Sequence, residues 1–392
     1  MKYVRLSLIL SIGLFFFASC ANNTEGNSST QNTEDSLSAV DKLEVNSDTL
    51  KPESPRNSKE ENITNSEKKV FSSPKEESIV EAKDRSKLSG VKLSSWNHTA
   101  SKKRILQFIE ASCNPNSSYF IPEDDRIATL DNDGTIWAEQ PTYYQIEYVI
   151  YRLKQLEPEH PEWEKNKLIQ AALNHDLKKL REKYGIKGLA KLLKITQSGM
   201  STKAFEKNVR NWALNASHPI QKKKYTDLVY KPMQELIRLL KAHRFKVYIV
   251  SSGGTDFIRA FSKPLFNIDK EYIIGSYQKL KYVEEEGQIS LIKMPEILCV
   301  SEDKGKVMNI QQVIGKKPVL AIGNSDRDIP MLKWSQQSEY KNMQIIIHHT
   351  DTEREWKYDK GANNGALDAG LQEAKQNHWV VVDIKKDWNR IF

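Results

Sequence analysis

Cysteine is scarce in this sequence, which contains three in 392 residues. Cys20 follows an apolar N-terminal run, so Cys113 and Cys299 are the two that remain for the rest of the chain. This number excludes a fold held together by several disulfides. It allows one disulfide between Cys113 and Cys299, and two free thiols are an equally good expectation.

A concentrated block of positive charge is also absent. Lys and Arg number 59 against 51 Asp and Glu, and the resulting formal charge of +8 is spread along the chain. A spread excess is typical of a solvated surface, and it also favours anionic substrates. Because no basic segment is interleaved with aromatic residues, we expect no nucleic-acid partner.

The chain has no apolar run long enough to span a bilayer comfortably. Residues 6–17 are largely apolar and follow Lys2 and Arg5, and the string Phe-Ala-Ser before Cys20 ends this region. A charged start, a short apolar run and small residues predict an export signal over residues 1–20. An uncleaved anchor is the alternative, and it would leave the protein on the same membrane.

The residues before Cys20 resemble a bacterial lipobox, with Phe17 where Leu is usual. The resemblance implies that Cys20 is lipidated and that the exported protein is anchored to a bacterial membrane. Ala21 follows, rather than the Asp that commonly retains lipoproteins in the inner membrane, so the outer membrane is favoured, on its periplasmic or surface face.

Aromatic residues are nearly missing from residues 21–95, where Phe71 is the only one. Ser, Asn, Thr, Glu and Lys dominate this segment. Such a composition cannot bury enough apolar surface to offset the entropy lost on ordering. We therefore expect a disordered tether that holds a globular part away from the lipid surface.

A short apolar strand expected over residues 126–130 leads into Asp131, Asp133 and Gly134. Side chains at the end of a buried parallel strand face a crevice, and two carboxylates there invite a hard cation such as Mg²⁺. Asp131 can attack phosphorus, while Asp133 can protonate the leaving oxygen and later activate water. The alternative is an ordinary turn rich in Asp and Gly.

The string Asp-Asn-Asp-Gly-Thr at residues 131–135 resembles the first motif of the haloacid dehalogenase-like (HAD) hydrolases. Phosphatases of that superfamily carry an acid at the second Asp position, so Asp133 implies hydrolysis of phosphate esters. Three later segments resemble the remaining motifs and occur in the required order.

The second of these motifs is a strand that ends in Ser or Thr. Residues 245–250 predict that strand, and Ser251, Ser252 and Gly253 follow it. Thr255 is expected to cap the next helix, whose N-terminus would favour an anion. The resemblance implies phosphate binding by Ser251, Ser252 and Gly253.

The third motif is a lysine at the start of a helix, expected here to run to Ile314. Lys304 and Lys306 compete for the role. Lys306 is favoured because Ile310 and Val313 follow it at helical spacing. Its ammonium would neutralise the charges of the nucleophile and the phosphate.

The fourth motif follows a strand expected over residues 318–322, and Pro330 begins the next helix. Relatives commonly carry Asp directly after the glycine, as a Mg²⁺ ligand, and this chain has Asn324. An amide oxygen can ligate Mg²⁺ but supplies no charge, so we expect weaker Mg²⁺ affinity than in those relatives. Asp328 matches the second acid and is expected to hold metal-bound water.

Helical spacing dominates the segment between the first and second motifs. Helices are expected over residues 144–156, 163–184, 188–195 and 202–213. An insertion at this place resembles the C1 cap of HAD phosphatases, especially the phosphoserine-phosphatase-like branch, and would exclude water and read the leaving group. A helical subdomain without a gating role is the alternative.

The tail predicts strands over residues 343–348 and 379–384 with a helix over residues 367–376 between them. A hairpin is expected within residues 272–292, turning at residues 285–287. His348 and His349 would point to opposite faces of their strand, so they could not easily chelate one metal, and a structural role is expected.

The predicted fold is α/β: a HAD-like, doubly wound parallel sheet with an inserted α-helical cap. The predicted domains are the signal peptide (1–20), the tether (21–95), the core (96–137 and 226–392) and the cap (138–225). The predicted function is Mg²⁺-dependent hydrolysis of a small phosphomonoester, with Mg²⁺ held by Asp131, Asp133, Asn324 and Asp328. The alternatives are a non-catalytic anion- or partner-binding lipoprotein and a phosphotransferase.

Overall fold

The structure, a computed structural model, describes residues 91–392. The predicted signal peptide, Cys20 and residues 21–90 of the predicted tether lie outside these described residues. Between residues 91 and 392, every helix is too short or too polar to cross a lipid bilayer.

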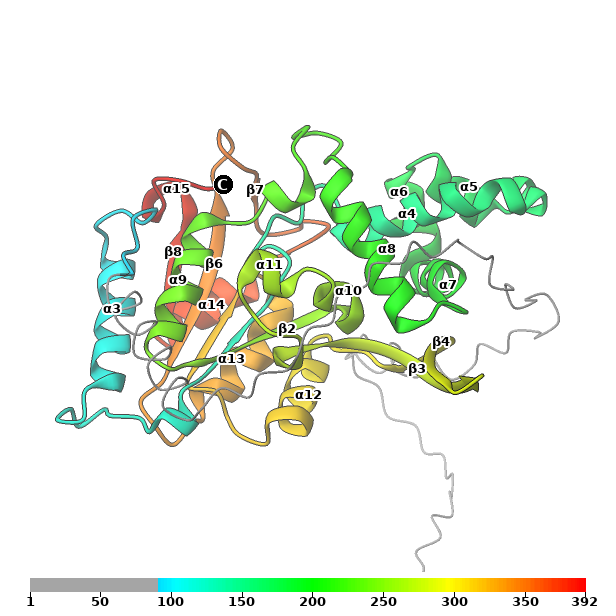
Figure 1. Cartoon of the computed structure of the whole chain (residues 1–392). Coiled ribbons are helices and arrows are strands. Elements are labelled where there is room, and N and C mark those ends of the chain that lie inside the picture. The colour runs from blue at the N-terminus through cyan, green and yellow to red at the C-terminus, as the bar shows by residue number, and fades with distance from the viewer. Residues whose placement is uncertain (1–90) are drawn as a thin grey trace, which may run out of the picture. The chain divides into compact units, whose positions relative to one another are not determined.

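A mainly parallel sheet forms the centre of the fold (Figure 1). β1 (Ile127–Leu130) lies between β2 (Lys246–Gly254) and β5 (Leu320–Gly323). Beyond these, β3 (Ile273–Glu285) pairs with β2 on one side, and β6 (Met343–Thr350) and β8 (Val380–Asp383) extend the other side, all in parallel. Because the chain adds strands on both sides of β1, the direction of winding reverses there, which opens a crevice at the carboxyl end of β1.

Helices cover both faces of the sheet. Successive strand residues alternate between two cores: Ile345 and Ile347 belong to one, and Ile346 between them belongs to the other. The first core includes α3 (Ala100–Cys113) and α9 (Lys231–Ala242); the second includes α12 (Lys304–Ile314), α13 (Ile329–Gln336) and α14 (Ala369–Gln376). The predicted doubly wound α/β fold is confirmed.

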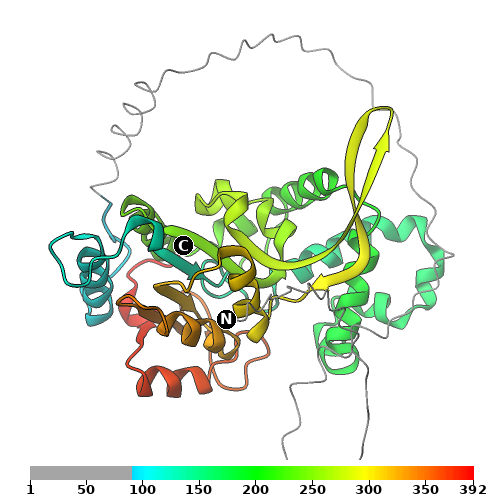
Figure 2. The ribbon, with the colours of Figure 1, turned by 90° about the horizontal axis from the view of Figure 1, so that it is seen from below.

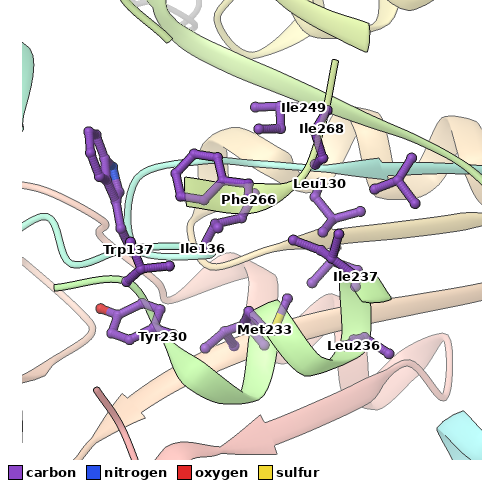
Figure 3. Packing of buried hydrophobic residues seen from close by; sticks show 14 of the residues in the cluster. Leu130, Ile136, Trp137, Tyr230, Met233, Leu236, Ile237, Ile249, Phe266 and Ile268 are labelled. Carbon is purple, nitrogen blue, oxygen red and sulfur yellow. The ribbon is translucent and has the colours of Figure 1, made fainter. Parts of the chain in front are cut away.

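The core beneath β1 shows how an amphipathic helix holds the sheet. α9 begins with Pro232 in its first turn, and its apolar residues recur at helical spacing. Figure 3 shows Met233 and Ile237 of α9 directed toward Leu130 of β1. All three side chains are fully buried, so this packing fixes the position of β1, the strand that leads into Asp131.

Five helices lie between β1 and α9 and gather to one side of the sheet (Figure 1). They are α4 (Tyr144–Leu156), α5 (Lys167–Leu173), α6 (Leu177–Lys179), α7 (Gly185–Gln197) and α8 (Thr202–Asn215). Val149, Leu153 and Leu192 belong to a small core of their own. The helical content of residues 138–225 matches the expectation, while their role as a cap stays a prediction.

The prediction of a single helix over residues 163–184 is wrong. Its residues form a 3₁₀ turn, α5, the single turn α6 and a π-helical turn (Leu180–Tyr184). Asn174 ends α5, His175 has a φ of 54°, and the Asp176 side chain accepts from the Lys179 backbone N–H at 3.0 Å. Asn and Asp side chains compete with the helix for backbone hydrogen bonds, and here they interrupt it.

The predicted hairpin is present and longer than expected. β3 pairs antiparallel with β4 (Gln288–Cys299), and Glu286 and Gly287 at the turn have φ values of 50° and 75°. Two successive residues at positive φ match the right-handed twist of the strands. The hairpin extends beyond the sheet (Figure 2), and the Gly199 N–H donates to the carbonyl of Lys293 in β4 at 2.9 Å.

The remaining elements are short. They are β7 (Lys357–Tyr358), antiparallel to β6, the helices α10 (Thr255–Arg259), α11 (Ser262–Phe266) and α15 (Ile384–Asp387), and several 3₁₀ turns. Cys113 and Cys299 could have formed a disulfide or remained free, and the structure shows that both are free thiols.

Candidate active site

The four predicted motifs meet at the carboxyl end of β1. Asp131 and Asp133 follow β1, Ser251 lies in β2, Lys306 lies in α12, and Asn324 and Asp328 follow β5. Because β2 and β5 flank β1 in parallel, their carboxyl ends share one edge of the sheet.

Lys306 is the buried cation of this site. Its Nζ lies 2.6 Å from Asp131 Oδ1 and 2.6 Å from Asp328 Oδ1. Burial opposes the charged form, yet the charges of Asp131 and Asp328 raise the pKa of Lys306 above its usual value, so it stays protonated. Lys304, in the preceding half turn, is exposed, so of the two candidate lysines Lys306 is the one that contacts the acids of the site.

Both carboxylate oxygens of Asp328 accept hydrogen bonds from other groups of the protein. Besides Lys306 at Oδ1, its Oδ2 accepts from the backbone N–H groups of Asn324 and Ser325, each at 3.1 Å, and from the Ser325 hydroxyl at 3.0 Å. A Cβ at Gly323 would lie 2.4 Å from the Asp328 Cβ, so glycine permits this close approach. The hydrogen bonding suits a residue that positions Lys306 and the loop after β5 better than one that faces a metal.

Asp133 is held from two sides. The Trp137 indole donates to Asp133 Oδ1 at 2.9 Å, and the Ser251 hydroxyl lies 3.5 Å from Oδ2. Gly134, at φ 75°, lets its N–H donate to the Trp137 carbonyl at 2.8 Å and closes the turn. Burial raises the pKa of Asp133, an effect that these donors partly oppose.

Glu139 is a buried acid of the site that sequence reasoning missed. Its Oε1 accepts from the Asn324 amide Nδ2 at 2.6 Å and from the Tyr358 hydroxyl at 2.9 Å. The other end of the Asn324 amide, Oδ1, accepts from the Thr135 hydroxyl at 3.2 Å. A Cβ at Gly134 would lie 2.1 Å from Asn324 Nδ2 and 2.3 Å from Glu139 Oε1, so only glycine leaves room for this pair.

The sequence carries one faint signal for Glu139. It follows the apolar residues Ile136, Trp137 and Ala138, all fully buried, and a lone acid directly after such a stretch is unusual. Burial, and then the charge of Asp133, raise the pKa of Glu139 well above its usual value.

The charges of the cluster favour a divalent cation. The site holds the carboxyl groups of Asp131, Asp133, Glu139 and Asp328 but one buried lysine, which contacts Asp131 and Asp328. Burial first and the charge of Asp328 second raise the pKa of Asp131 to about 7, against the opposing effect of Lys306. Carboxylate and amide oxygens are the donors that Mg²⁺ prefers.

Carboxylates alone do not complete such a site. Among residues 91–392, no three His, Cys, Asp or Glu side chains are grouped closely enough to hold a metal by themselves. A further oxygen donor is needed, and the Asn324 amide oxygen, which accepts from the Thr135 hydroxyl, is one that the neighbouring residues offer. The residues therefore fit Mg²⁺.

The second motif differs from its prediction in detail. β2 continues to Gly254 rather than ending at residue 250, and α10 begins at Thr255, whose side chain makes no capping bond; the N-cap is Gly254. The Gly254 N–H donates instead to Gln145 Oε1 of α4 at 2.8 Å. This side chain holds the chain extended through Gly254, so the predicted cap at Thr255 is wrong.

Ser251 is buried, and its hydroxyl accepts from the Gly253 N–H at 3.0 Å. Ser252 is exposed to the cavity, whose lining also includes Gly253, Asp131 and Lys306. The three predicted phosphate-binding residues of this motif therefore lie beside the predicted nucleophile.

His349 contacts the backbone of the first motif at Gly134. One ring nitrogen lies 2.7 Å from the Gly134 carbonyl oxygen and the other 3.0 Å from Glu355 Oε2, and the ring stacks on Tyr358 at 4.3 Å. His348 points elsewhere, with Asp359 3.5 Å away. The two rings do not share a site, as their places on the strand predicted, and a structural role for both stays a prediction.

Comparison with known proteins gives one family. The family model described as haloacid dehalogenase-like hydrolase matches residues 128–333, just over half of the chain. No curated protein matches the sequence.

Solved structures with a similar arrangement include a conserved protein of unknown function from Anaerococcus prevotii, which is 16% identical, with a TM-score of 0.48 over 74% of this chain and 93% of that chain. A phosphoserine phosphohydrolase-like protein from Francisella tularensis is 16% identical, with a TM-score of 0.32 over 57% of this chain and 87% of that one. A HAD family hydrolase from Salmonella enterica is 15% identical, with a TM-score of 0.31 over 56% and 61% of the two chains.

Proposed function

Because the chain belongs to the haloacid dehalogenase-like hydrolase family, we propose that it hydrolyses small phosphomonoesters with Mg²⁺ and through an aspartyl-phosphate on Asp131. The observation that carries the proposal is the Lys306 ammonium, 2.6 Å from Asp131 Oδ1 inside a cluster of buried carboxylates. A buried cation beside a nucleophilic carboxylate is what attack on a phosphate dianion requires.

Asp131 is the nucleophile in this proposal. Lys306 occupies Oδ1, whereas Oδ2 makes no hydrogen bond with any of residues 91–392 and is left for attack on phosphorus. A P–O bond to Asp131 forms as the bond to the leaving oxygen breaks. Lys306, Ser251, Ser252 and the Gly253 N–H hold the phosphoryl oxygens, and these donors offset the developing charge.

In this proposal Asp133 is the general acid for the leaving oxygen and then the general base for the attacking water. Burial raises its pKa, which lets it carry the proton that the leaving oxygen needs. The Trp137 indole fixes the direction of its carboxyl group. Once ionised, Asp133 accepts a proton from the water that cleaves the aspartyl-phosphate, and phosphate is released.

Mg²⁺ would be held by Asp131, the main-chain carbonyl of Asp133 and the Asn324 amide oxygen, where it would neutralise charge on the phosphoryl group. Glu139 adds a negative charge beside Asn324 and fixes its amide by accepting from Nδ2. Asp328, predicted as a further metal residue, acts in this proposal by positioning Lys306.

The first test is hydrolysis of p-nitrophenyl phosphate with and without Mg²⁺. We expect Mg²⁺-dependent turnover that Asp131→Asn abolishes and the exposed control Asp124→Asn retains. Folded protein that releases no phosphate from this or several natural monoesters would contradict the proposal and favour an anion- or partner-binding protein. Transfer of phosphate to added alcohols in preference to water would instead favour a phosphotransferase.

We also propose that residues 1–20 direct export and that Cys20 carries lipid, which would place the hydrolase on a bacterial outer membrane. The support is the sequence pattern before Cys20. Metabolic labelling with a fatty acid, compared between the natural protein and Cys20→Ser, tests it. Label in neither protein would contradict it.

A further inference from the structure

Beyond Ser276 the β3–β4 hairpin is a ribbon of two strands. β3 pairs with β2 as far as Ser276, and from there to the turn at Glu286 and Gly287 it pairs with β4 alone (Figure 2). In an antiparallel ribbon, alternate side chains point to opposite faces, and residues that pair directly share a face. The register therefore assigns each side chain of the ribbon to one of two faces.

One of these faces is apolar. The pairs on it are Leu280–Lys293, Tyr282–Leu291 and Glu284–Ile289. We call the part formed by Leu280, Tyr282, Ile289 and Leu291 the apolar hairpin face. The opposite face of the same stretch carries Lys281, Val283, Glu285, Gln288, Ser290 and Ile292. Such an alternation of apolar and polar residues is typical of an antiparallel sheet that packs one face on a core.

The apolar hairpin face is nevertheless exposed. The exposed fractions of Leu280, Tyr282, Ile289 and Leu291 are 42%, 56%, 61% and 41%. Lys293, on the same face and nearer the sheet, is buried, and its Nζ lies 4.7 Å from the centre of the Phe205 ring of α8. The face is thus covered at its base and open to solvent farther out. An exposed apolar surface of this kind marks a site of association.

The charges at the tip of the hairpin argue against lipid as the partner. Glu284, Glu285 and Glu286 are all exposed and lie at the turn. Anionic headgroups repel such a tip, and inserting three carboxylates into lipid costs more free energy than a few apolar side chains gain there. The apolar hairpin face therefore suits a protein surface.

The charges around the base of the hairpin have the opposite sign. The Gly199 N–H, between α7 and α8, donates to the carbonyl of Lys293 at the base. Lys194 in the last turn of α7 and Lys203 in the first turn of α8 flank this contact. Lys203 is exposed and Lys194 is half-buried, and neither forms an ion pair with any of residues 91–392. The hairpin is therefore negative at its tip and positive around its base.

A surface arranged in this way is complementary to itself. When two hairpins stack antiparallel across a two-fold axis near the Tyr282–Leu291 pair, the apolar hairpin faces meet and the tip of each lies over the base of the other. The acids of each copy then approach the lysines of the second copy, at both ends of the contact. A parallel stack would bring like charges together instead.

We propose that this protein forms a homodimer in which two apolar hairpin faces pack against each other, tip to base. The occupant of the exposed face is thus a second copy of the same chain. Packing the two faces together removes their apolar side chains from water, which favours association. This inference goes beyond the proposed hydrolysis and does not depend on it.

Sedimentation equilibrium of the full-length protein tests the proposal. Every sample carries Cys20→Ser, so that no lipid drives association. Between about 1 and about 100 µM protein, we expect the average mass to rise from that of one chain, 45.1 kDa, toward that of two.

The double variant Ile289→Lys/Leu291→Lys places two charges in the contact and should associate about tenfold or more weakly. Its matched control is Leu106→Lys/Val313→Lys, which changes exposed apolar residues of α3 and α12 outside the hairpin. The control should associate as the unsubstituted protein does.

Two charge-reversed proteins identify the partner as a second copy. Glu284→Lys/Glu285→Lys reverses the tip, and Lys194→Glu/Lys203→Glu reverses the base. At low ionic strength each protein alone brings like charges together and should associate weakly. An equal mixture of the two should associate as the unsubstituted protein does, because opposite charges meet at both ends of the mixed dimer.

A mass of one chain throughout the concentration range overturns the proposal. So does a mixture of the charge-reversed proteins that associates no better than its two components, or association of Ile289→Lys/Leu291→Lys as strong as that of its control. The mixture keeps the test decisive if the two lysines in β4 impair folding, since it leaves the apolar hairpin face intact.

Discussion

At the residue scale, we propose that Asn324 and Glu139 share what an aspartate after Gly323 would do alone. In the proposed Mg²⁺ site the amide would supply an oxygen, and the carboxylate of Glu139, 2.6 Å from Asn324 Nδ2, would supply the charge once Mg²⁺ is bound. An amide is ambiguous as a ligand because nitrogen and oxygen are similar in size. Two contacts remove the ambiguity: Glu139 Oε1 accepts from the amide nitrogen, and the Thr135 hydroxyl donates to the amide oxygen.

From the contact between Asn324 and Glu139 we predict that substituting both residues reverses the changes in stability and Mg²⁺ affinity that each single substitution causes. Asn324→Asp places two carboxylates together, so at pH 8 without metal we expect it to lower the free energy of unfolding by about 1–3 kcal/mol and to bind Mg²⁺ more tightly. Glu139→Gln should keep its stability and bind Mg²⁺ about tenfold more weakly. Asn324→Asp/Glu139→Gln restores the charge and should approach the natural protein in both measurements.

Urea unfolding in EDTA and calorimetric titration of Mg²⁺ measure these changes. Effects of the two single substitutions that simply add in the double variant would show that the residues are not coupled.

Lys306 predicts a second change at this scale. Lys306→Met leaves Asp131 and Asp328 buried without their cation, so we expect about 3–5 kcal/mol less stability at pH 8 in EDTA and no phosphatase activity. Lys304→Met, two residues earlier and exposed, is the matched control and should leave the unfolding midpoint unchanged. Equal effects of the two substitutions would contradict the role given to Lys306.

At the element scale, a short polar segment separates two of the helices that lie between β1 and α9. α5 and α6 are separated at Asn174–Asp176, and His175 reaches back to α4, where its Nε2 lies 2.9 Å from Glu147 Oε1. The hydrogen bond from Glu147 raises the pKa of His175 above its usual value, while burial opposes the shift. This contact ties two helices together when the imidazole is protonated.

The pH dependence of unfolding should show this contact. Because the pKa is higher in the folded protein, the stabilisation is complete below about pH 6.5, the unfolded value, and is lost as the pH rises through the folded value. The side chain is 35% exposed, so the effect should stay below about 1 kcal/mol. Thermal unfolding of the natural protein and Glu147→Gln at pH 5.5 and 8.5 measures it. A difference between the two proteins that does not shrink at pH 8.5 would contradict the assignment.

At the scale of the whole molecule, residues 91–95, which precede the predicted core boundary at residue 96, already pack against the core. Glu235 of α9 accepts from the Ser95 N–H at 2.9 Å and from the Ser94 hydroxyl at 2.6 Å, and Leu93 is buried. The Trp96 indole donates to the Pro232 carbonyl at 3.0 Å and its ring packs edge-on against Trp388 at 5.8 Å. This segment links α9 to the C-terminal end of the chain.

Two shortened chains test the link. A chain beginning at Val91 should unfold at the same urea concentration as the full-length protein. A chain beginning at His98 loses Trp96 and leaves Glu235 without its donors, so it should be about 3–5 kcal/mol less stable. Equal stability of the two shortened chains would contradict the role of residues 91–97.

Local patterns in the sequence were enough to predict the strands of the parallel sheet, its doubly wound order and the places where polar residues meet; the two-residue β7 was not predicted. Apolar runs set the strands, and the acids, hydroxyls and glycines at their ends, such as Asp131 and Ser251, follow from the edge that parallel strands share. Helix ends were less predictable. The break at His175 and the start of α10 at Thr255 depend on single hydrogen bonds, which spacing does not reveal.

Contacts between distant residues were decided by the tertiary structure alone. Glu139 lies 185 residues from Asn324 in the chain, and no periodicity relates them; they meet because β1 and β5 are neighbours and the glycine at 134 leaves space. Lys304 and Lys306 look alike in sequence, yet the direction in which α12 packs buries one and exposes the other. Element type follows from short-range preference, whereas the identity of touching side chains follows from how those elements pack.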